Sequence, residues 1–264
     1  MIGSTVLDAR TGETGRVAYA KGHLHGAIHA DLDRDLAAPP THPEHGGRHS
    51  LPSLATWAAT LGRWGISRET HVLVYDDQGG ANAAARAWWM LRAVGHTRVS
   101  VLSGGWQAAL SLGLPVDDNV PAATDIGPYP ISRWELPIAT LEDVKTRLAD
   151  RSWGLIDVRS RARYRGESEP IDPVAGHIPG AINMPFGETL DAHGHFKSAS
   201  ELRALYEPRL HEGQSAATMV HCGSGVTACH TLLALEHVGL HGASLYVGSW
   251  SEWCRQADAV IAKE

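Results

Sequence analysis

Cysteine is scarce in this sequence. Among 264 residues there are three cysteines, Cys222, Cys229 and Cys254, all near the C-terminal end. An odd number of cysteines confined to one end of the chain cannot form the disulfide framework of a small secreted domain. The opening residues, MIGSTVLDAR, also lack the basic start and apolar stretch of a secretory signal. We therefore expect a cytoplasmic protein in a reducing compartment.

Long apolar runs and clusters of basic charge are absent too. No stretch approaches the roughly 18 apolar residues that a membrane helix requires. The formal net charge is -6, and the 23 lysines and arginines form no long cluster. These absences argue against a membrane-spanning protein and against a nucleic-acid binder. We expect the partners to be small molecules or other proteins, with no nucleic acid and no membrane.

The two halves of the chain repeat one another. LDAR at 7–10 matches IDVR at 156–159, and GHLHGAI at 22–28 matches GHIPGAI at 176–182. The spacing between matching segments drifts along the chain, which indicates connecting loops of different lengths. A repeat this long is the duplication of a whole domain and not a solenoid.

Each half alternates two kinds of segment. β-Branched runs such as HVLVY and GLIDV alternate with helix-like segments such as ANAAARAWWMLRAV. This pattern predicts an α/β fold in each half, a parallel sheet flanked by helices. The segment DNVPAATDIGPYPISRWELPIAT, with four prolines, has the composition of an extended linker. We therefore predict one domain at 1–118, a linker at 119–138 and a second domain at 139–264.

Several side chains are predicted to serve packing or local structure. Trp88 and Trp89 lie among apolar neighbours, and Cys229 lies on the apolar stripe of a predicted helix. Ser198, three residues before Glu201, predicts a capping box at a helix start.

Cys222 stands where the predicted strand ATMVH gives way to a helix beginning near Thr227. Ligands of parallel α/β sheets bind beyond the C-terminal ends of the strands. Gly223 and Gly225 can adopt positive φ, which lets the N–H groups of the loop point to one focus that attracts negative charge. The helix N-terminus adds partial positive charge. Together these features favour the thiolate of Cys222 and predict a nucleophile.

The first half has Asp76 at the position equivalent to Cys222. No nucleophile remains in that half. We therefore expect one catalytic copy, with the other copy supporting it and supplying walls to a site between the domains.

Position 228 separates two kinds of cysteine chemistry. A tyrosine-phosphatase-type loop needs an arginine there, but the residue is Ala228, so bidentate phosphate recognition is lost. The sequence around Cys222 is also unlike that of papain-like proteases. A loop of this length, from Cys222 to Thr227, instead suits a persulfide whose terminal sulfur lies among N–H donors.

Seven segments carry a resemblance to a known family: GHLHGAI, ARAWWMLRAVGH, LSGGW, DVRSRARYRGE, GHIPGAINMPF, CGSGVTAC and GSWSEW. In this order they resemble the two-domain sulfurtransferases of the rhodanese superfamily, across essentially the whole chain. The resemblance implies an inactive N-terminal rhodanese-like domain and a C-terminal one that forms a persulfide on Cys222. CGSGVT resembles the loop of 3-mercaptopyruvate sulfurtransferases, because thiosulfate-specific members usually carry basic residues where this chain has Gly223 and Ser224.

The resemblance also implies roles for other residues. Ser224, His49 and Asp33 would form a Ser-His-Asp arrangement that protonates the enolate of pyruvate. Arg163, in RARYRGE, would hold the substrate carboxylate. Ile171 stands about where mercaptopyruvate enzymes tend to carry a second arginine. The substrate-binding loop residues would be Gly223, Gly225, Val226 and Thr227.

The expected activity is transfer of sulfane sulfur from 3-mercaptopyruvate through a Cys222 persulfide, with release of pyruvate. The acceptor would be cyanide or a thiol, including the thiol of a small redox protein. Thiosulfate as the donor, and a non-catalytic persulfide carrier, are the alternatives.

No cofactor and no metal are expected. The 16 histidines follow neither the HExxH pattern nor a Cys-His ligand spacing. His23 and His177 occur once in each copy, including the copy without a nucleophile, which predicts a structural role for both.

Overall fold

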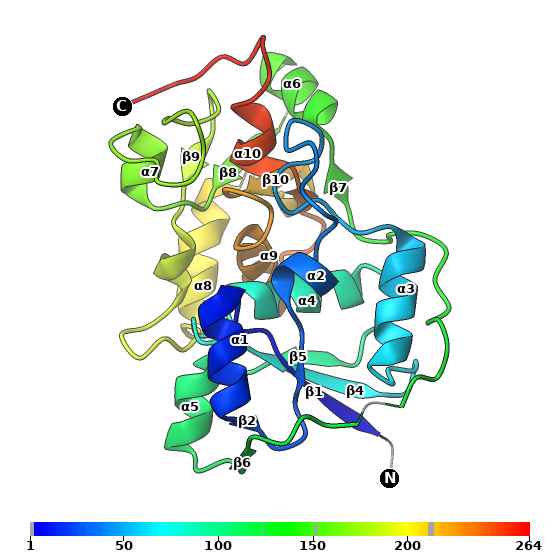
Figure 1. Ribbon diagram of the computed structural model, residues 1–264. Coiled ribbons are helices and arrows are strands. Elements are labelled where there is room, and N and C mark those ends of the chain that lie inside the picture. The colour runs from blue at the N-terminus through cyan, green and yellow to red at the C-terminus, as the bar shows by residue number, and fades with distance from the viewer. Residues whose placement is uncertain (1–2, 123, 151–152, 211–213) are drawn as a thin grey trace. The chain divides into compact units, whose positions relative to one another are not determined.

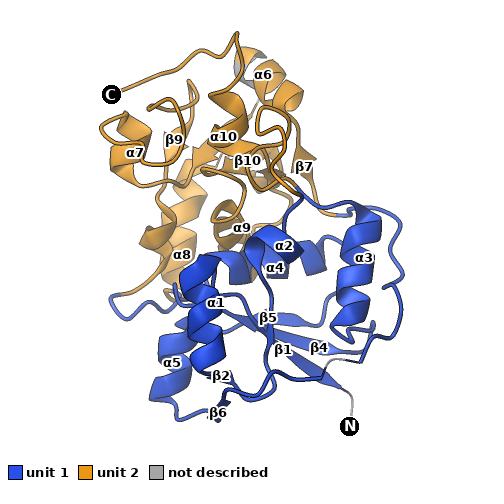
Figure 2. Cartoon of the chain, viewed as in Figure 1, with its two compact units in different colours: residues 1–38, 51–135, 192–196 blue, residues 39–50, 136–191, 197–264 orange. Residues whose placement is uncertain are grey.

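A computed structural model describes residues 3–122, 124–150, 153–210 and 214–264 (Figure 1). Residue 123 of the predicted linker lies outside the described residues. The chain divides into two compact units (Figure 2): unit 1 holds residues 1–38, 51–135 and 192–196, and unit 2 holds residues 39–50, 136–191 and 197–264. Segment 39–50 comes from the first half of the sequence but packs in unit 2, the unit that contains Cys222.

Unit 1 is built on a parallel sheet with strand order β3-β1-β4-β5. Strands β2 and β6 form a separate two-stranded antiparallel sheet. The predicted strand HVLVY is β4, and it buries Val72, Val74 and Tyr75. The elements of unit 1 are β1 Ser4–Asp8, α1 Gly12–Lys21, β2 His23–Leu24, β3 Ile28–His29, α2 Leu32–Asp35, α3 Leu54–Arg63, β4 His71–Tyr75, α4 Ala83–Arg92, β5 Val99–Val101, α5 Gly105–Ser111 and β6 Val116–Asp117.

Unit 2 is built on a parallel sheet with strand order β7-β11-β10-β8-β9. Its helix α8 begins with the predicted capping box, in which Ser198 and Glu201 bond reciprocally. The elements of unit 2 are β7 Ile138–Ala139, α6 Leu141–Asp150, β8 Gly154–Asp157, α7 Arg161–Arg165, β9 Ile182–Asn183, η1 Phe186–Thr189, α8 Ala199–Tyr206, η2 Glu207–Arg209, η4 Ser215–Ala217, β10 Thr218–His221, α9 Ala228–His237, β11 Ser244–Tyr246 and α10 Ser249–Trp253.

The two sheets share one topology, which confirms the predicted α/β fold and the duplication. Strands β3-β1-β4-β5 of unit 1 correspond in order to β9-β8-β10-β11 of unit 2. In each unit the first long strand pairs in parallel with the strand that precedes the central loop, β1 with β4 and β8 with β10. Because these central strands are covered on both faces, their side chains are apolar in succession and not in alternation.

A buried Asp-Arg pair follows the first strand in both units. Arg10 Nη2 donates to Asp8 Oδ2 at 2.6 Å and to the carbonyl of Gly22 at 2.7 Å. Arg159 Nη2 donates to Asp157 Oδ2 at 2.6 Å and to the corresponding carbonyl of the second copy at 2.7 Å. The bidentate geometry satisfies carboxylates that are completely buried. Burial opposes ionisation of Asp157, but His221 and Arg159 together hold its pKa below the usual range.

His23 and His177 serve packing in their own copies, as their occurrence once per copy predicted. His23 Nδ1 bonds to the carbonyl of Tyr19 at 2.9 Å, and His177 Nδ1 bonds to that of Tyr164 at 2.8 Å. The rings stack on the same tyrosines, with centroids 4.0 and 3.8 Å apart. Among the described residues, no group of three or more His, Cys, Asp or Glu is placed to hold a metal ion.

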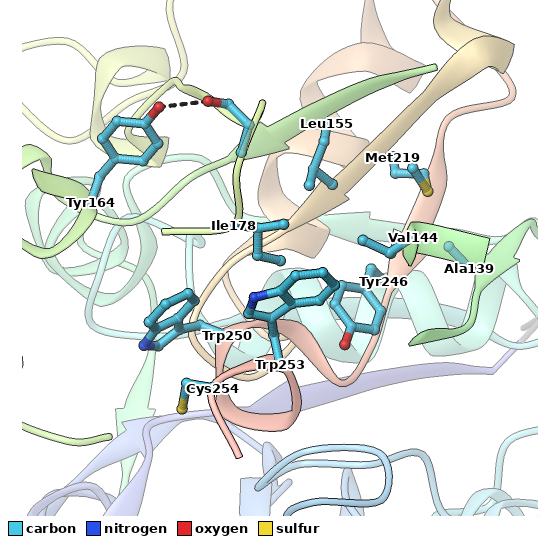
Figure 3. Close-up of a cluster of buried hydrophobic side chains, with 11 residues drawn as sticks. Ala139, Val144, Leu155, Tyr164, Ile178, Met219, Tyr246, Trp250, Trp253 and Cys254 are labelled. Atoms are coloured by element: carbon cyan, nitrogen blue, oxygen red, sulfur yellow. Dashed lines mark hydrogen bonds between the residues drawn. The ribbon is translucent and has the colours of Figure 1, made fainter. Parts of the chain in front are cut away.

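The core of unit 2 lies against the face of the sheet that carries α10 (Figure 3). Trp250 and Trp253 of α10 pack there with Ile178 and Tyr246, and the Trp250 indole donates to the carbonyl of Val174 at 2.9 Å. This packing fixes α10 on the sheet, and the first residues of α10 face the Cys222 loop, as described below.

Three smaller predictions about burial are confirmed. Trp88 and Trp89 of α4 are 5% and 2% exposed, and Cys229 of α9 is completely buried.

None of the described helices has the length and apolar character needed to cross a membrane.

The Asp157–Arg159 pair yields a stability prediction. Arg159→Met leaves a completely buried carboxylate without its main partner, so we expect it to lower the free energy of unfolding by about 3–5 kcal/mol. Urea denaturation measures the change. Arg161→Met is the matched control, because that side chain is 58% exposed and a surface ion pair contributes about 1 kcal/mol or less. Equal losses in the two variants would contradict the assignment.

Candidate active site

Cys222 occupies the turn between β10 and α9, as the sequence predicted. The loop is tied to the beginning of α10 by three hydrogen bonds. The Cys222 N–H donates to Ser249 Oγ at 3.2 Å, and its carbonyl accepts from the N–H of Trp250 at 3.0 Å. The Gly223 carbonyl accepts from the N–H of Ser251 at 2.9 Å. Cys222 is 2% exposed, so the residue is almost completely buried.

The two loop glycines have different physical roles. Gly225 has φ +73°, and a methyl group added to it would lie 2.5 Å from the carbonyl oxygen of Val247. Only glycine fits there. Gly223 does not have positive φ, so that part of the sequence prediction is wrong for it. Its lack of a side chain instead leaves room for the guanidinium groups of Arg163 and Arg48.

The remaining two loop residues complete the turn into α9. Val226 is 4% exposed, and its carbonyl accepts from the N–H of Cys229 at 3.0 Å. The carbonyl of Thr227 accepts from the N–H of His230 at 3.1 Å. A role of Val226 and Thr227 in substrate binding stays a prediction.

The equivalent loop of unit 1 shows what this turn does to an anionic group. Asp76, 1% exposed, accepts four backbone N–H groups, from its own loop and from the start of α4, at 2.8 to 3.2 Å. These donors belong to Gln78, Gly80, Asn82 and Ala84. Burial raises the pKa of the Asp76 carboxyl, and the four N–H groups oppose that shift. In unit 1 the strand-to-helix turn therefore presents a ring of converging backbone donors to an anionic group.

Ser224 and His49 meet although 175 positions separate them in the sequence. His49 Nδ1 and Ser224 Oγ form a hydrogen bond of 2.8 Å, and both residues belong to unit 2 because segment 39–50 packs there. Ser224 is 6% exposed. Asp33 belongs to α2 of unit 1, where its N–H donates to Asp31 at 3.0 Å. Its place as the third member of the arrangement stays a prediction.

Arg163 lies in the middle of α7 and is held by carboxylates. Its Nη2 donates to Glu169 Oε1 at 2.7 Å, and its Nε donates to Glu169 Oε2 at 3.1 Å. Asp172 Oδ2 lies 3.5 Å from the same Nη2. Ile171, between the two acids, is 55% exposed and carries no charge. The guanidinium of Arg163 is thus fixed in orientation beside the Cys222 loop.

Sequence reasoning missed three residues at this site: Arg48, Asp172 and Ser249. Arg48 binds Asp172 in unit 2 and lies beside Gly223. Its adjacency to His49 was the only available signal. Ser249 could have been found in the repeat, because GSW of the second half aligns with GGW of the first.

Ser249 has a strained backbone conformation, and its hydroxyl binds the Cys222 loop. It is the one non-glycine residue with positive φ among the described residues, at 56°, and its counterpart Gly105 has the same φ. Its hydroxyl accepts the N–H of Cys222 and donates to the carbonyl of Tyr246 at 2.9 Å. A left-handed conformation costs a non-glycine residue about 1–2 kcal/mol. The serine is favoured here because no glycine could make these two bonds.

The other two cysteines are packed away from this chemistry. Cys229 Sγ bonds to the carbonyl of Gly225 at 3.3 Å inside the turn. Cys254 belongs to the core cluster of unit 2, and burial, with the nearby Asp172 charge, raises its pKa to about 11. Cys254 is therefore a thiol at neutral pH.

A family model supports the interpretation of this site. The rhodanese-like domain matches residues 1–111 and again residues 140–256. The chain therefore belongs to the rhodanese family, as a two-domain sulfurtransferase, and the resemblance found in the sequence is confirmed.

Relatives of the chain include 3-mercaptopyruvate sulfurtransferases and thiosulfate sulfurtransferases. The chain is 41% identical over 243 residues to the probable 3-mercaptopyruvate sulfurtransferase of Pseudomonas aeruginosa, covering 90% of this chain and 84% of the relative. It is 37% identical over 265 residues to the thiosulfate sulfurtransferase of Cricetulus griseus, covering 97% and 86%. The solved 3-mercaptopyruvate sulfurtransferase of Leishmania major superposes with a TM-score of 0.82 at 30% identity, covering 95% of this chain and 70% of that one.

The strain at Ser249 can be separated from its hydrogen bonds. Ser249→Ala loses both bonds and keeps the left-handed strain, whereas Ser249→Gly loses the bonds but removes the strain. We expect Ser249→Gly to be more stable than Ser249→Ala by about 1 kcal/mol in urea denaturation. Both should be less stable than the parent chain, because the Cys222 N–H is left buried and unpaired at a cost of about 1–3 kcal/mol. An alanine variant as stable as the glycine variant would show that position 249 is not strained.

Proposed function

We propose that this sulfurtransferase takes sulfur from 3-mercaptopyruvate. The Cys222 thiolate attacks the sulfur of the donor, a sulfur–sulfur bond forms, and the carbon–sulfur bond breaks. The electron pair of that bond passes to the enolate of pyruvate, which becomes pyruvate when its carbon takes up a proton. A thiol acceptor or cyanide then removes the outer sulfur and restores Cys222.

The observation that carries this choice of donor is the hydrogen bond between Ser224 and His49. Cleavage of 3-mercaptopyruvate produces an enolate that must be protonated, and a hydroxyl paired with an imidazole can deliver that proton. Cleavage of thiosulfate expels sulfite, which needs no proton on carbon. The loop residues Gly223 and Ser224 also bring no positive charge of their own. The relatives named for 3-mercaptopyruvate support the same choice.

The other predicted features complete the proposal. Arg163 would bind the donor carboxylate, Gly223, Gly225, Val226 and Thr227 would surround the transferred sulfur, and Asp33 would support His49. A small redox protein would serve as a thiol acceptor. The three cysteines form no disulfide with one another, which suits a cytoplasmic location. We also propose the domain boundaries expected from the sequence, with the first domain ending at 118 and the second beginning at 139.

The donor is tested by comparing two rates of the same preparation. We expect pyruvate release from 3-mercaptopyruvate, with a thiol acceptor, to exceed thiocyanate formation from thiosulfate and cyanide by about tenfold or more, a difference of about 1.4 kcal/mol in transition-state stabilisation. The reverse ranking would assign the chain to thiosulfate.

Cys222→Ser tests the covalent step. Intact mass after incubation with 3-mercaptopyruvate should show one added sulfur on the parent chain, removable by reductant, and none on the variant. Cys229→Ser and Cys254→Ser are the matched controls, and both should still gain the sulfur. Labelling that survives in Cys222→Ser would place the persulfide elsewhere.

Ser224→Ala tests the proton relay. Loss of a general acid lowers a rate by about 10²- to 10⁴-fold, so kcat for pyruvate release should fall in that range. Any transfer from thiosulfate should change little, because sulfite leaves without protonation. Ser111→Ala, at an exposed position of α5 in unit 1, controls for the substitution itself. Equal losses with both donors would show that Ser224 supports the loop and not the proton transfer.

A further inference from the structure

Two guanidinium groups converge on Gly223, the residue that follows Cys222. A methyl group added to Gly223 would lie 3.2 Å from Arg163 Nη1 and 3.5 Å from Arg48 Nη2. The two arginines come from distant parts of the sequence, α7 and segment 39–50, and both lie in unit 2. Their side chains are 17% and 20% exposed, so solvent reaches both.

One buried carboxylate holds both groups in place. Asp172, whose side chain is completely buried, accepts from Arg48 Nη1 through Oδ1 and lies 3.5 Å from Arg163 Nη2 through Oδ2. Arg48 is also fixed through its backbone, whose N–H donates to Ser251 Oγ at 3.2 Å. Since Ser251 belongs to the same helix start that holds the Cys222 loop, Arg48 is positioned relative to the loop by the loop's own anchor.

Each arginine keeps an uncommitted nitrogen toward Gly223. Within the described part of the chain, neither Arg48 Nη2 nor Arg163 Nη1 donates to a protein acceptor, whereas Arg48 Nη1 and the Nε and Nη2 of Arg163 do. A guanidinium carries five N–H groups in a rigid fork, so these nitrogens remain available for a ligand.

The local charge also favours an anion. Asp172 and Glu169 are shared by three guanidinium groups, those of Arg48, Arg163 and Arg255. Arg159 also approaches Glu169, but Asp157 already neutralises it. One positive charge is therefore in excess beside the Cys222 loop.

We propose that Arg48 binds the anionic end of the sulfur donor together with Arg163. The anionic end is the carboxylate of 3-mercaptopyruvate or, for thiosulfate, its sulfonate oxygens. This inference rests on the proposed function. Segment 39–50 then supplies two adjacent side chains to the site. Arg48 binds the donor, and His49 pairs with Ser224. The uncharged Ile171 supplies no such contact.

The test is steady-state kinetics of Arg48→Met with both donors. Loss of one charge-assisted hydrogen bond is expected to raise KM for the preferred donor about 10- to 100-fold with a much smaller change in kcat. Arg48→Lys, which keeps the charge without the fork, should recover part of the loss. Unchanged KM in Arg48→Met would overturn the inference.

Two controls separate donor binding from structure. Arg255→Met removes a different partner of the same Asp172 oxygen, and Arg161→Met removes an exposed arginine of α7. Arg161→Met should keep KM at the parent value. Arg255→Met lowers the local positive charge without removing a donor contact, so it should raise KM by much less than Arg48→Met does. If Arg255→Met raised KM as much as Arg48→Met does, Arg48 would be acting through Asp172 and not on the donor.

A second readout bypasses the donor site. Each protein is loaded to completion with inorganic polysulfide, desalted, and mixed with 2-mercaptoethanol, an uncharged acceptor. Arg48→Met should transfer the loaded sulfur at the parent rate, and an equal loss in this step would overturn the inference. A parent chain that turns over neither donor would defeat the proposed function, whereas an active parent with an unaffected Arg48→Met defeats only the role of Arg48.

Discussion

Hydrogen bonds from the main chain of the Cys222 loop to the start of α10 govern the geometry of this site. Ser249, Trp250 and Ser251 bind the main chain of Cys222 and Gly223 within 3.2 Å. The anchor is rigid because Trp250 and Trp253 of the same helix are buried in the core of unit 2. The position of the sulfur is therefore set by core packing, and the loop itself needs only to be short and to contain glycine at 225.

The duplicated fold explains how one copy could lose the nucleophile without losing stability. Both copies keep the buried Asp-Arg pair and the stacked Tyr-His pair, because these satisfy groups that water cannot reach. At the turn of unit 1, the converging N–H groups require a hydrogen-bond acceptor. The Asp76 carboxyl is that acceptor. In unit 2 the equivalent position holds the sulfur of Cys222 in place of a carboxylate.

Sequence patterns predicted the fold more completely than the site. Strands such as HVLVY and the capping box at Ser198 depend on neighbours in the sequence, and the repeat gave each prediction twice. Local reasoning also identified the turn at Cys222, but it assigned Gly223 a positive φ because glycine permits that angle without requiring it. What Gly223 provides is space for Arg48 and Arg163, and space depends on residues that are distant in sequence. Arg48 and Asp172 were missed for the same reason.

Because segment 39–50 packs in unit 2, the first half of the sequence contributes residues to the unit that contains Cys222. The repeat suggests that the first copy is inert, yet its sequence delivers His49 and Arg48 to the unit that holds Cys222. The segment is fixed there by contacts with α10, including the N–H of Gly46, which donates to Glu252 Oε1 at 2.7 Å. Gly47 approaches the carbonyl of Gly248 too closely for any side chain. Among the described residues, the imidazole that bonds to Ser224 therefore comes from the half of the sequence that has no nucleophile.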